Sequence, residues 1–151
     1  MLFSIVSLLV PSALATVVSQ RQTLSGSTVC QQIAGNITGQ VYYPLSTNYN
    51  SDVFHYFASS AQSSTCVVEV ATPEDVSSVL KIVGSTRTPF AVKSGGHSSN
   101  QGFSSTTGVH ISLVRISQII LSADKQTVEV GLGNVSFSLR PCKSMHCLCC
   151  Y

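Results

Sequence analysis

The sequence CVVEVATPEDVSSVLKIVGSTRTPFAVK, residues 66–93, predicts a strand, a helix and a second strand in direct succession. Residues 66–70 are rich in β-branched side chains, as in a buried strand. Thr72 is a favourable N-cap, and Pro73 stands at the first helical position ahead of two acidic residues that suit the positive end of the helix dipole. Residues 89–93 form the second strand, and a right-handed crossover between parallel strands is the expected connection.

The helix itself is predicted by the spacing of its apolar side chains. Val76, Val79, Leu80 and Val83 recur at i, i+3, i+4 and i+7, which places them along one face of a helix. Gly84 follows the last of them and is a common residue at a helix end. We therefore expect an amphipathic helix that ends at Gly84.

The chain beyond the second strand continues the pattern of short strands. Residues 108–113 predict a third strand, and residues 119–121 and 127–130 flank a polar turn as in a hairpin. No internal repeat is present. From residue 136 the sequence has neither strand nor helix periodicity, and it is rich in cysteine. The fold class expected from this order of elements is α+β.

A glycine-rich loop, SGGHSS at residues 94–99, follows the second strand. Glycine allows positive φ angles and a close approach of the backbone to a ligand. Successive free N–H groups in such a turn form a concave nest that suits phosphate oxygens, and small hydroxyl side chains add donors. The loop is chemically fit to hold a pyrophosphate. The alternative interpretation is a plain turn between two strands.

This loop matches neither of the common phosphate-binding motifs. The Walker motif needs Gly-Lys-Ser/Thr, and His97 stands where the lysine would be. A dinucleotide-binding Gly-x-Gly-x-x-Gly is approached by Gly131 and Gly133, but residue 136 is serine and no helical pattern follows.

The first fifteen residues, MLFSIVSLLVPSALA, carry no charged side chain and end in Ala-Leu-Ala. They predict a secretory signal peptide over residues 1–15, and hence a secreted, extracellular protein. The alternative is a buried N-terminal helix. A membrane span is not expected here because the run is short and Pro11 interrupts it, and no other segment is long and apolar enough to span.

Two further features agree with secretion. Asn36 and Asn134 each begin an Asn-x-Ser/Thr triplet, which is an acceptor for glycosylation. Six cysteines in an exported chain favour disulfides, although four of them lie within the last ten residues. Residues 16–65 are predicted to be an irregular N-terminal lead-in with a short helix over residues 52–61.

The charge composition excludes some partners. Eight basic and six acidic residues give a net charge of +2 with no basic stripe, so nucleic acid is not an indicated partner. His55 and His110 read as packed or surface residues. His146 lies among the C-terminal cysteines, whose spacing does not match a zinc knuckle. We therefore predict no metal site, and no residue stands out as catalytic.

Taken in order, the helix start at residues 73–76, the segment FAVKSGGHS at residues 90–98, and residues 109–113 and 127–134 form a spaced series. This series resembles the N-terminal half of the FAD-binding domain of the vanillyl-alcohol oxidase (PCMH) type. Within that group it is most similar to the secreted berberine-bridge-like oxidases of fungi. The resemblance covers residues 40–135 and implies a truncated PCMH-type domain, with residues 66–135 as the partial FAD-binding domain and residues 136–151 as an atypical tail.

The resemblance implies FAD as the cofactor, held through its pyrophosphate by the glycine loop. His97 would bond covalently to the flavin 8α carbon, since a neutral imidazole nitrogen is a competent nucleophile near neutral pH. Gly131, Gly133 and Asn134 form a second segment that would lie near the flavin, with less specific individual roles. A disulfide between Cys30 and Cys66 is also implied, the alternative being two buried thiols. The implied cofactor-binding residues are Ser94, Gly95, Gly96, His97, Ser98, Ser99, Gly102, Gly131, Gly133 and Asn134.

The implied function is that of a secreted FAD-dependent oxidoreductase that moves a hydride from a substrate C–H bond to flavin and is reoxidised by oxygen. Similar proteins continue for several hundred further residues, so a small-molecule substrate is expected only for a full-length protein, and the 151-residue chain alone is expected to have no substantial oxidase activity. The tail from residue 136 is interpreted as a translated intron or a shifted frame, or else as the end of a genuine short protein. The alternative functions are a non-catalytic remnant and a small secreted interaction protein without flavin.

Overall fold

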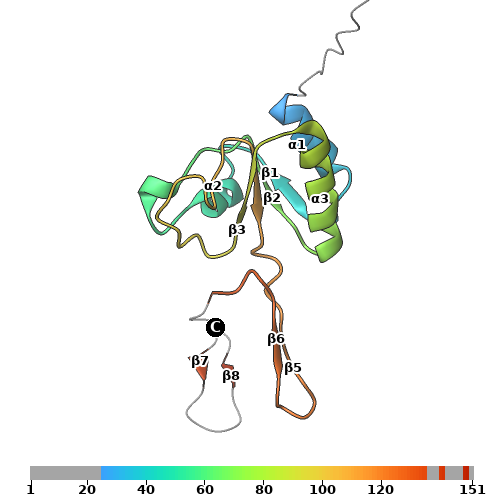
Figure 1. Ribbon diagram of the computed structural model, residues 1–151, viewed down its shortest axis with the longest axis vertical. Helices are drawn as coiled ribbons and strands as arrows, with labels where there is room; N and C mark the ends of the chain where they lie inside the picture. The colour runs from blue at the N-terminus through green and yellow to red at the C-terminus, as the bar shows by residue number, and fades with distance from the viewer. Residues whose placement is uncertain (1–24, 136–139, 142–147, 150–151) are drawn as a thin grey trace, which may run out of the picture.

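A computed structural model describes residues 25–135, 140–141 and 148–149 of the chain (Figure 1). A four-stranded sheet with the strand order β1-β2-β4-β3 forms its centre. The strands are β1 (Gln40–Tyr42), β2 (Cys66–Glu69), β4 (Val109–Ser112) and β3 (Phe90–Lys93). The predicted signal peptide lies outside the described residues.

The predicted strand–helix–strand unit is confirmed, but its two strands are not neighbours. Both β2 and β3 pair in parallel with β4, which lies between them and aligns Ile111 with Val68 on one side and with Val92 on the other. β1 adds to the far side of β2 in antiparallel orientation. The fold is α+β, as the sequence predicted.

Helix α3 (Pro73–Thr86) connects β2 to β3. Its start is as predicted, because the Thr72 hydroxyl accepts a hydrogen bond of 3.2 Å from the backbone N–H of Asp75. Its end is not at Gly84, which lies inside the helix. The Thr86 hydroxyl donates to the carbonyl of Ile82 at 2.8 Å and extends the last turn. Arg87, with φ 54°, then supplies the left-handed residue that ends the helix.

The N-terminal segment is more regular than predicted. It contains helix α1 (Gly26–Ala34), strand β1, helix α2 (Thr47–Val53) and the 3-10 turn η1 (Ala58–Ser60). The expected helix over residues 52–61 was therefore wrong in position. The expected disulfide is confirmed, since Cys30 of α1 is bonded to Cys66 of β2.

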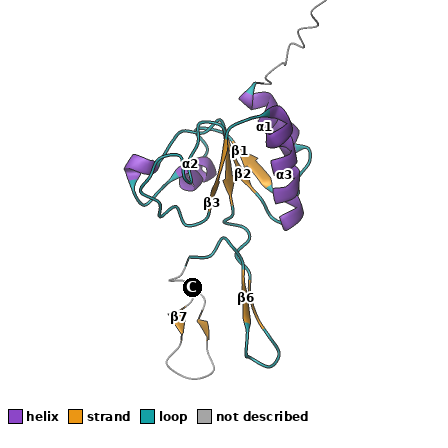
Figure 2. Ribbon diagram, viewed as in Figure 1, coloured by secondary structure: helices purple, strands orange, loops and turns teal. Residues whose placement is uncertain are grey.

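The core lies between the sheet and the helix pair α1 and α3, which cover one face of the sheet (Figure 2). Helix α2 lies on the opposite face. Because both faces are covered, all four residues of the central strand β4 are buried, in contrast to the alternation of a half-exposed strand. The buried apolar side chains of the helices and central strands include Val29, Ile33, Val68, Val79, Val83, Val109 and Ile111.

The predicted hairpin is confirmed as β5 (Ile119–Leu121) and β6 (Val128–Val130), which pair in antiparallel fashion. Two short strands, β7 (Arg140–Pro141) and β8 (Leu148–Cys149), also pair. The other residues of the cysteine-rich tail lie outside the described residues. Within the described part of the chain, no helix has the length and apolar character needed to cross a membrane.

Candidate cofactor-binding loop

The glycine loop begins where β3 ends, at the carboxyl edge of the parallel strands. The carbonyl of Lys93 accepts a hydrogen bond from the N–H of Leu113 at 2.9 Å, which fixes the loop's start beside β4. Gly96 has φ 69°, a conformation that side chains rarely adopt, and its carbonyl accepts from the N–H of Tyr56 at 3.1 Å. The loop is thus fastened at its start and at its centre.

The loop presents a row of free backbone donors. Among the described residues, no acceptor is bonded to the N–H groups of residues 95–99. Within this run, Gly96 alone has a positive φ. A single residue in the left-handed conformation turns successive N–H groups toward a common point. The hydroxyl of Ser98 accepts from the N–H of Asn100 at 3.2 Å. The loop therefore fits an anionic group such as a pyrophosphate.

The second predicted segment lies against the first. The hydroxyl of Ser94 donates to the carbonyl of Leu132 at 2.5 Å. A Cβ atom at Gly95 would lie 2.5 Å from a methyl group of Val135, so this position leaves no room for a side chain. The structure thus brings residues 94–95 and 132–135 together, although they are far apart in the sequence.

Backbone contacts hold that second segment in place. The N–H of Gly131 donates to the carbonyl of Gln118 at 2.8 Å, and the N–H of Gly133 donates to the carbonyl of Ile116 at 2.7 Å. A Cβ atom on Gly133 would lie 2.1 Å from the Leu113 carbonyl oxygen, which explains the glycine. The side-chain amide of Asn134 donates to Ser117 and Gly131 carbonyls. The side-chain amide of Asn134 is therefore occupied by hydrogen bonds within the turn.

Gly102 lies at the far end of the loop. It is exposed with φ 87°, and its N–H donates to the hydroxyl of Ser105 at 3.1 Å. That buried hydroxyl in turn donates to the carbonyl of Ser60 at 2.6 Å. Gly102 therefore closes the loop onto the segment around η1, and no hydrogen bond joins it to residues 94–99 in the described part of the chain.

His97 is the exposed histidine of the loop, and no hydrogen bond engages either of its ring nitrogens among the described residues. The ring of Tyr56 lies beside it, with the two centroids 5.6 Å apart and the planes tilted by 39°. His55 differs, because both of its ring nitrogens are within hydrogen-bond distance of backbone or hydroxyl oxygens. Tyr56 was not predicted, since an aromatic residue 41 positions away carries no signal of this contact.

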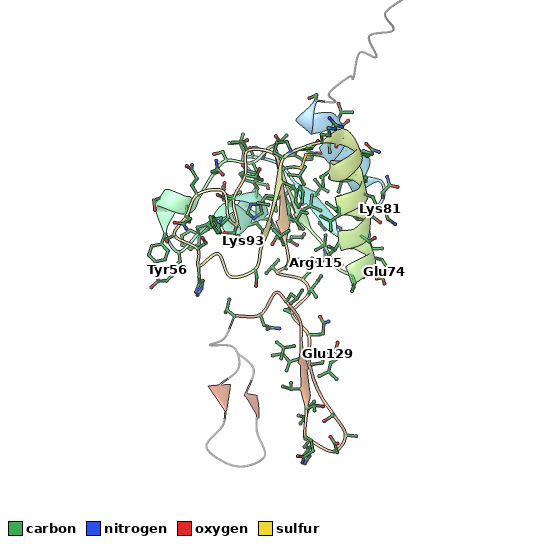
Figure 3. All side chains as sticks on the ribbon, viewed as in Figure 1. Tyr56, Glu74, Lys81, Lys93, Arg115 and Glu129 are labelled. Atoms are coloured by element: carbon green, nitrogen blue, oxygen red, sulfur yellow. A yellow bond between two sulfur atoms is a disulfide. The ribbon has the colours of Figure 1, made fainter. Side chains whose placement is uncertain are left out.

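A layer of buried polar side chains lies beneath the loop, between the sheet and α2. Lys93 is only 8% exposed, and Figure 3 shows it between α2 and the sheet. A Cβ atom on Gly96 would lie 2.7 Å from its Cε atom, so the loop rests directly on the lysine side chain. Burial lowers the pKa of Lys93, and the carboxylate of Asp52 partly opposes this effect.

Two carboxyl groups share this polar layer. Asp52 accepts a hydrogen bond of 2.8 Å from the hydroxyl of Ser112, while its other oxygen has no partner among the described residues. Burial raises the pKa of Glu69, and the neighbouring Asp52 raises it further, against the opposing charge of Arg115. The sequence did not reveal this layer, because its members are single polar residues on separate elements of the chain.

His110 of β4 completes the layer as a fully buried imidazole. Neither ring nitrogen has a hydrogen-bond partner in the described part of the chain. Burial lowers the pKa of His110 from 6.5 to about 4, assisted by the charges of Lys93 and His55. Of the two interpretations of His110 from the sequence, packed or surface, the structure shows the packed one.

This depressed pKa predicts a loss of stability in mild acid. The unfolded chain takes up a proton on His110 near pH 6.5, whereas the folded chain keeps this imidazole neutral down to about pH 4. The stability contribution is therefore complete above the unfolded pKa and falls as the pH falls, by about 2 kcal/mol between about pH 7 and about pH 5. Urea unfolding of the protein and of His110→Leu at both pH values measures it. The free energy of unfolding of the variant should not show this fall with pH. An equal fall in the two proteins would contradict the assignment to His110.

The comparisons with known proteins identify the family and the fold. A sequence profile of the FAD binding domain family matches residues 64–141, which is more than half of the chain. The chain belongs to this family, and FAD is accordingly its cofactor.

Two curated relatives illustrate the similarity. The FAD-dependent monooxygenase macF of Penicillium terrestre is 46% identical over 74 residues, which cover 48% of this chain and 14% of that protein. The FAD-dependent monooxygenase tpcD of Cochliobolus heterostrophus is 31% identical over 115 residues, which cover 74% of this chain and 22% of that protein. The chain thus spans less than a quarter of the length of these relatives.

Solved structures share the fold. The xylooligosaccharide oxidase from Myceliophthora thermophila C1 matches with a TM-score of 0.61 and 18% identity over 70% of this chain and 23% of that one. A berberine-bridge-like enzyme from Physcomitrella patens matches with a TM-score of 0.59 and 15% identity over 69% of this chain and 23% of that one. The predicted resemblance to FAD oxidases of the PCMH type is confirmed.

Proposed function

We propose that this chain is the pyrophosphate-binding and flavin-attachment part of a secreted FAD-dependent oxidoreductase. The observation that carries the proposal is the run of free N–H groups at residues 95–99, which contains an exposed His97 whose ring has no hydrogen bond among the described residues. A loop of this geometry stabilises the negative charge of a diphosphate through its backbone.

The residues of the loop divide the work of holding the cofactor. Gly95 and Gly96 keep the backbone free of side chains, so that the diphosphate can approach the N–H groups. Ser98 and Ser99 add hydroxyl groups at the exposed rim. Lys93 lies beneath the loop and contributes positive charge from below. When bound, FAD accepts a hydride from a substrate C–H bond and passes the electrons to dioxygen.

His97 is the proposed attachment point. Attachment exchanges one imidazole N–H bond and one C–H bond of the flavin 8α methyl group for a single N–C bond. Dioxygen takes up the two electrons and two protons that this exchange releases and becomes hydrogen peroxide. The chain's contribution is an imidazole whose nitrogens are free, because no hydrogen bond in the described residues engages them.

Secretion and substrate class are parts of the same proposal. The signal-like residues 1–15 and the bond between Cys30 and Cys66 support an oxidising, extracellular compartment. The substrate is proposed to be a small organic molecule, oxidised by a protein of the relatives' length. The names of the similar proteins include monooxygenases and an oligosaccharide oxidase. These names do not point to a single type of substrate bond.

The covalent bond offers the sharpest test of the proposed function. The 151-residue chain, produced in the presence of FAD, is precipitated with acid and examined for flavin fluorescence on a denaturing gel and for its mass. We expect fluorescence that survives denaturation and a mass increase equal to FAD less two hydrogen atoms. His97→Ala should lose the covalent flavin completely while keeping the fold.

His146→Ala is a histidine control outside the loop, in the C-terminal tail. A flavin that is bound by the unmodified chain but released by acid would overturn the attachment at His97 and leave the loop's binding role standing. No flavin in either fraction would overturn both and favour a flavin-free interaction protein.

A further inference from the structure

We propose that Tyr56 is a positioning residue that holds the ring of His97 in the orientation needed for covalent attachment. This inference rests on the proposed function of His97. Neither the sequence pattern nor the family membership singles out Tyr56, which lies in the connection between α2 and η1.

The aromatic ring of Tyr56 lies beside the imidazole of His97. The two ring centroids are 5.6 Å apart and the planes are tilted by 39°, so one face of His97 is shielded by Tyr56. His97 stands on a loop of glycine and serine, and no hydrogen bond in the described residues fixes its ring. The contact with Tyr56 is therefore what restricts the imidazole's rotation.

Tyr56 is itself anchored to the same loop. Its backbone N–H donates to the carbonyl of Gly96 at 3.1 Å, one residue before His97. The preceding residue, His55, is within 2.9 Å of the carbonyl of Val53 and within 2.9 Å of the hydroxyl of Ser104. These contacts tie the Tyr56 backbone to both sides of the loop. These backbone contacts place Tyr56 beside His97, with the tyrosine side chain 73% exposed.

An aromatic neighbour suits a histidine that must form a bond through a ring nitrogen. A hydrogen-bond partner would occupy the nitrogen lone pair or orient it away, whereas a ring that covers the face leaves both nitrogens at the free edge. Holding a nucleophile near its bonding geometry removes rotational freedom that would otherwise slow the reaction. Tyr56 thus acts through His97 and needs no contact with the substrate.

The test compares ring removal with ring retention. Covalent flavin is measured as acid-stable fluorescence per protein after a fixed incubation with FAD. Tyr56→Ala should lower the rate of attachment by about ten-fold, and Tyr56→Phe should restore it, because the ring and not the hydroxyl forms the contact. Phe103→Ala is the matched control, since Phe103 is an exposed aromatic that contacts no other aromatic ring among the described residues.

A second readout needs no flavin. The ring protons of His97 should show an upfield NMR shift from the tyrosine ring current, which Tyr56→Ala removes and Phe103→Ala keeps. A normal attachment rate in Tyr56→Ala would overturn the inference, as would an unchanged His97 spectrum. Absence of covalent flavin in the unmodified chain would instead overturn the proposed role of His97, so the two failures are distinguishable.

Discussion

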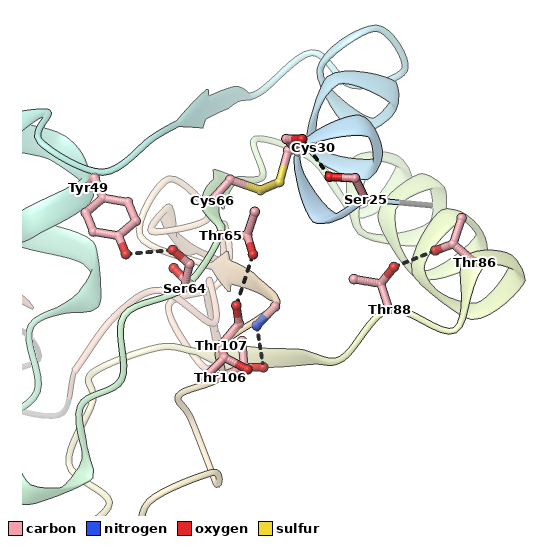
Figure 4. The surroundings of a disulfide bond; sticks show 12 residues. Ser25, Cys30, Tyr49, Ser64, Thr65, Cys66, Thr86, Thr88, Thr106 and Thr107 are labelled. Atoms are coloured by element: carbon pink, nitrogen blue, oxygen red, sulfur yellow. Dashed lines mark hydrogen bonds between the residues drawn. A yellow bond between two sulfur atoms is a disulfide. The ribbon is translucent and has the colours of Figure 1, made fainter. Parts of the chain in front are cut away.

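Replacing Cys30 and Cys66 together by serine is expected to lower the free energy of unfolding by about 4 kcal/mol. The disulfide joins residues 36 positions apart, and it restricts the unfolded chain to conformations in which α1 stays near β2. Figure 4 shows the bond between the helix and the strand. Both cysteines are fully buried within the apolar core, so their loss also weakens the packing of α1.

Urea unfolding monitored by circular dichroism measures this effect. The four C-terminal cysteines should be replaced by serine in both proteins, so that they cannot exchange with the pair under study. A variant with alanine at both positions controls for the cost of burying two serine hydroxyls. A loss below about 1 kcal/mol in both variants would show that α1 packs equally well without the bond.

Asp75→Ala is expected to be comparably damaging, at about 4 kcal/mol, because one carboxylate satisfies three backbone N–H groups. Its oxygens accept hydrogen bonds from the N–H groups of Thr38 at 2.8 Å, Gly39 at 3.0 Å and Ala71 at 2.9 Å. The Thr38 hydroxyl adds a further contact at 3.0 Å. The side chain is 3% exposed, so these donors would lose their acceptor in a place that water hardly reaches.

The same carboxylate gives a defined dependence on pH. Burial alone would raise the pKa of Asp75, but the hydrogen bonds from Thr38, Ala71 and Gly39 outweigh it and lower the pKa. The stabilisation is therefore present above the unfolded pKa and is lost as the pH falls toward the folded pKa. Asp75→Asn should remove this loss on acidification, in addition to destabilising the protein at neutral pH.

Glu74→Gln is the matched control for Asp75. Glu74 is the exposed neighbouring acid in the first turn of α3, and neutralising it should cost only about 0.5 kcal/mol through the helix dipole. Thermal or urea unfolding of the three variants separates the two effects. Equal losses of unfolding free energy in Glu74→Gln and Asp75→Asn would mean that negative charge at the helix start stabilises the protein. The three hydrogen bonds of Asp75 would then contribute nothing measurable.

The elements predicted correctly are those whose signals are local. The β-branched run at β2 and the cap formed by Thr72 and Pro73 depend on neighbouring residues only, and they fix α3 and its flanking strands. Helix α1 was missed because its sequence, GSTVCQQIA, starts at glycine with no side-chain cap. Its stability comes from burial of Val29 and Ile33 and from the disulfide, which the local sequence does not encode.

The same distinction applies to the site. The glycine loop was predictable because its chemistry lies in consecutive residues. The pairing of Ser94 with Leu132 and the packing of Tyr56 beside His97 depend on how distant segments meet. The position of the short helix α2 was also not predicted from the sequence. This helix is built from weak helix formers such as Thr47 and Asn50, and the Ser46 hydroxyl caps its start.

The position of β4 between β2 and β3 has a consequence for biosynthesis. When β3 leaves the ribosome it has no strand to pair with, because its partner in the sheet, residues 109–112, is translated only after the glycine loop. A nascent chain that ends before β4 therefore holds the loop without the frame that shapes it. The glycine loop therefore reaches its folded shape only after β4 has been inserted between β2 and β3.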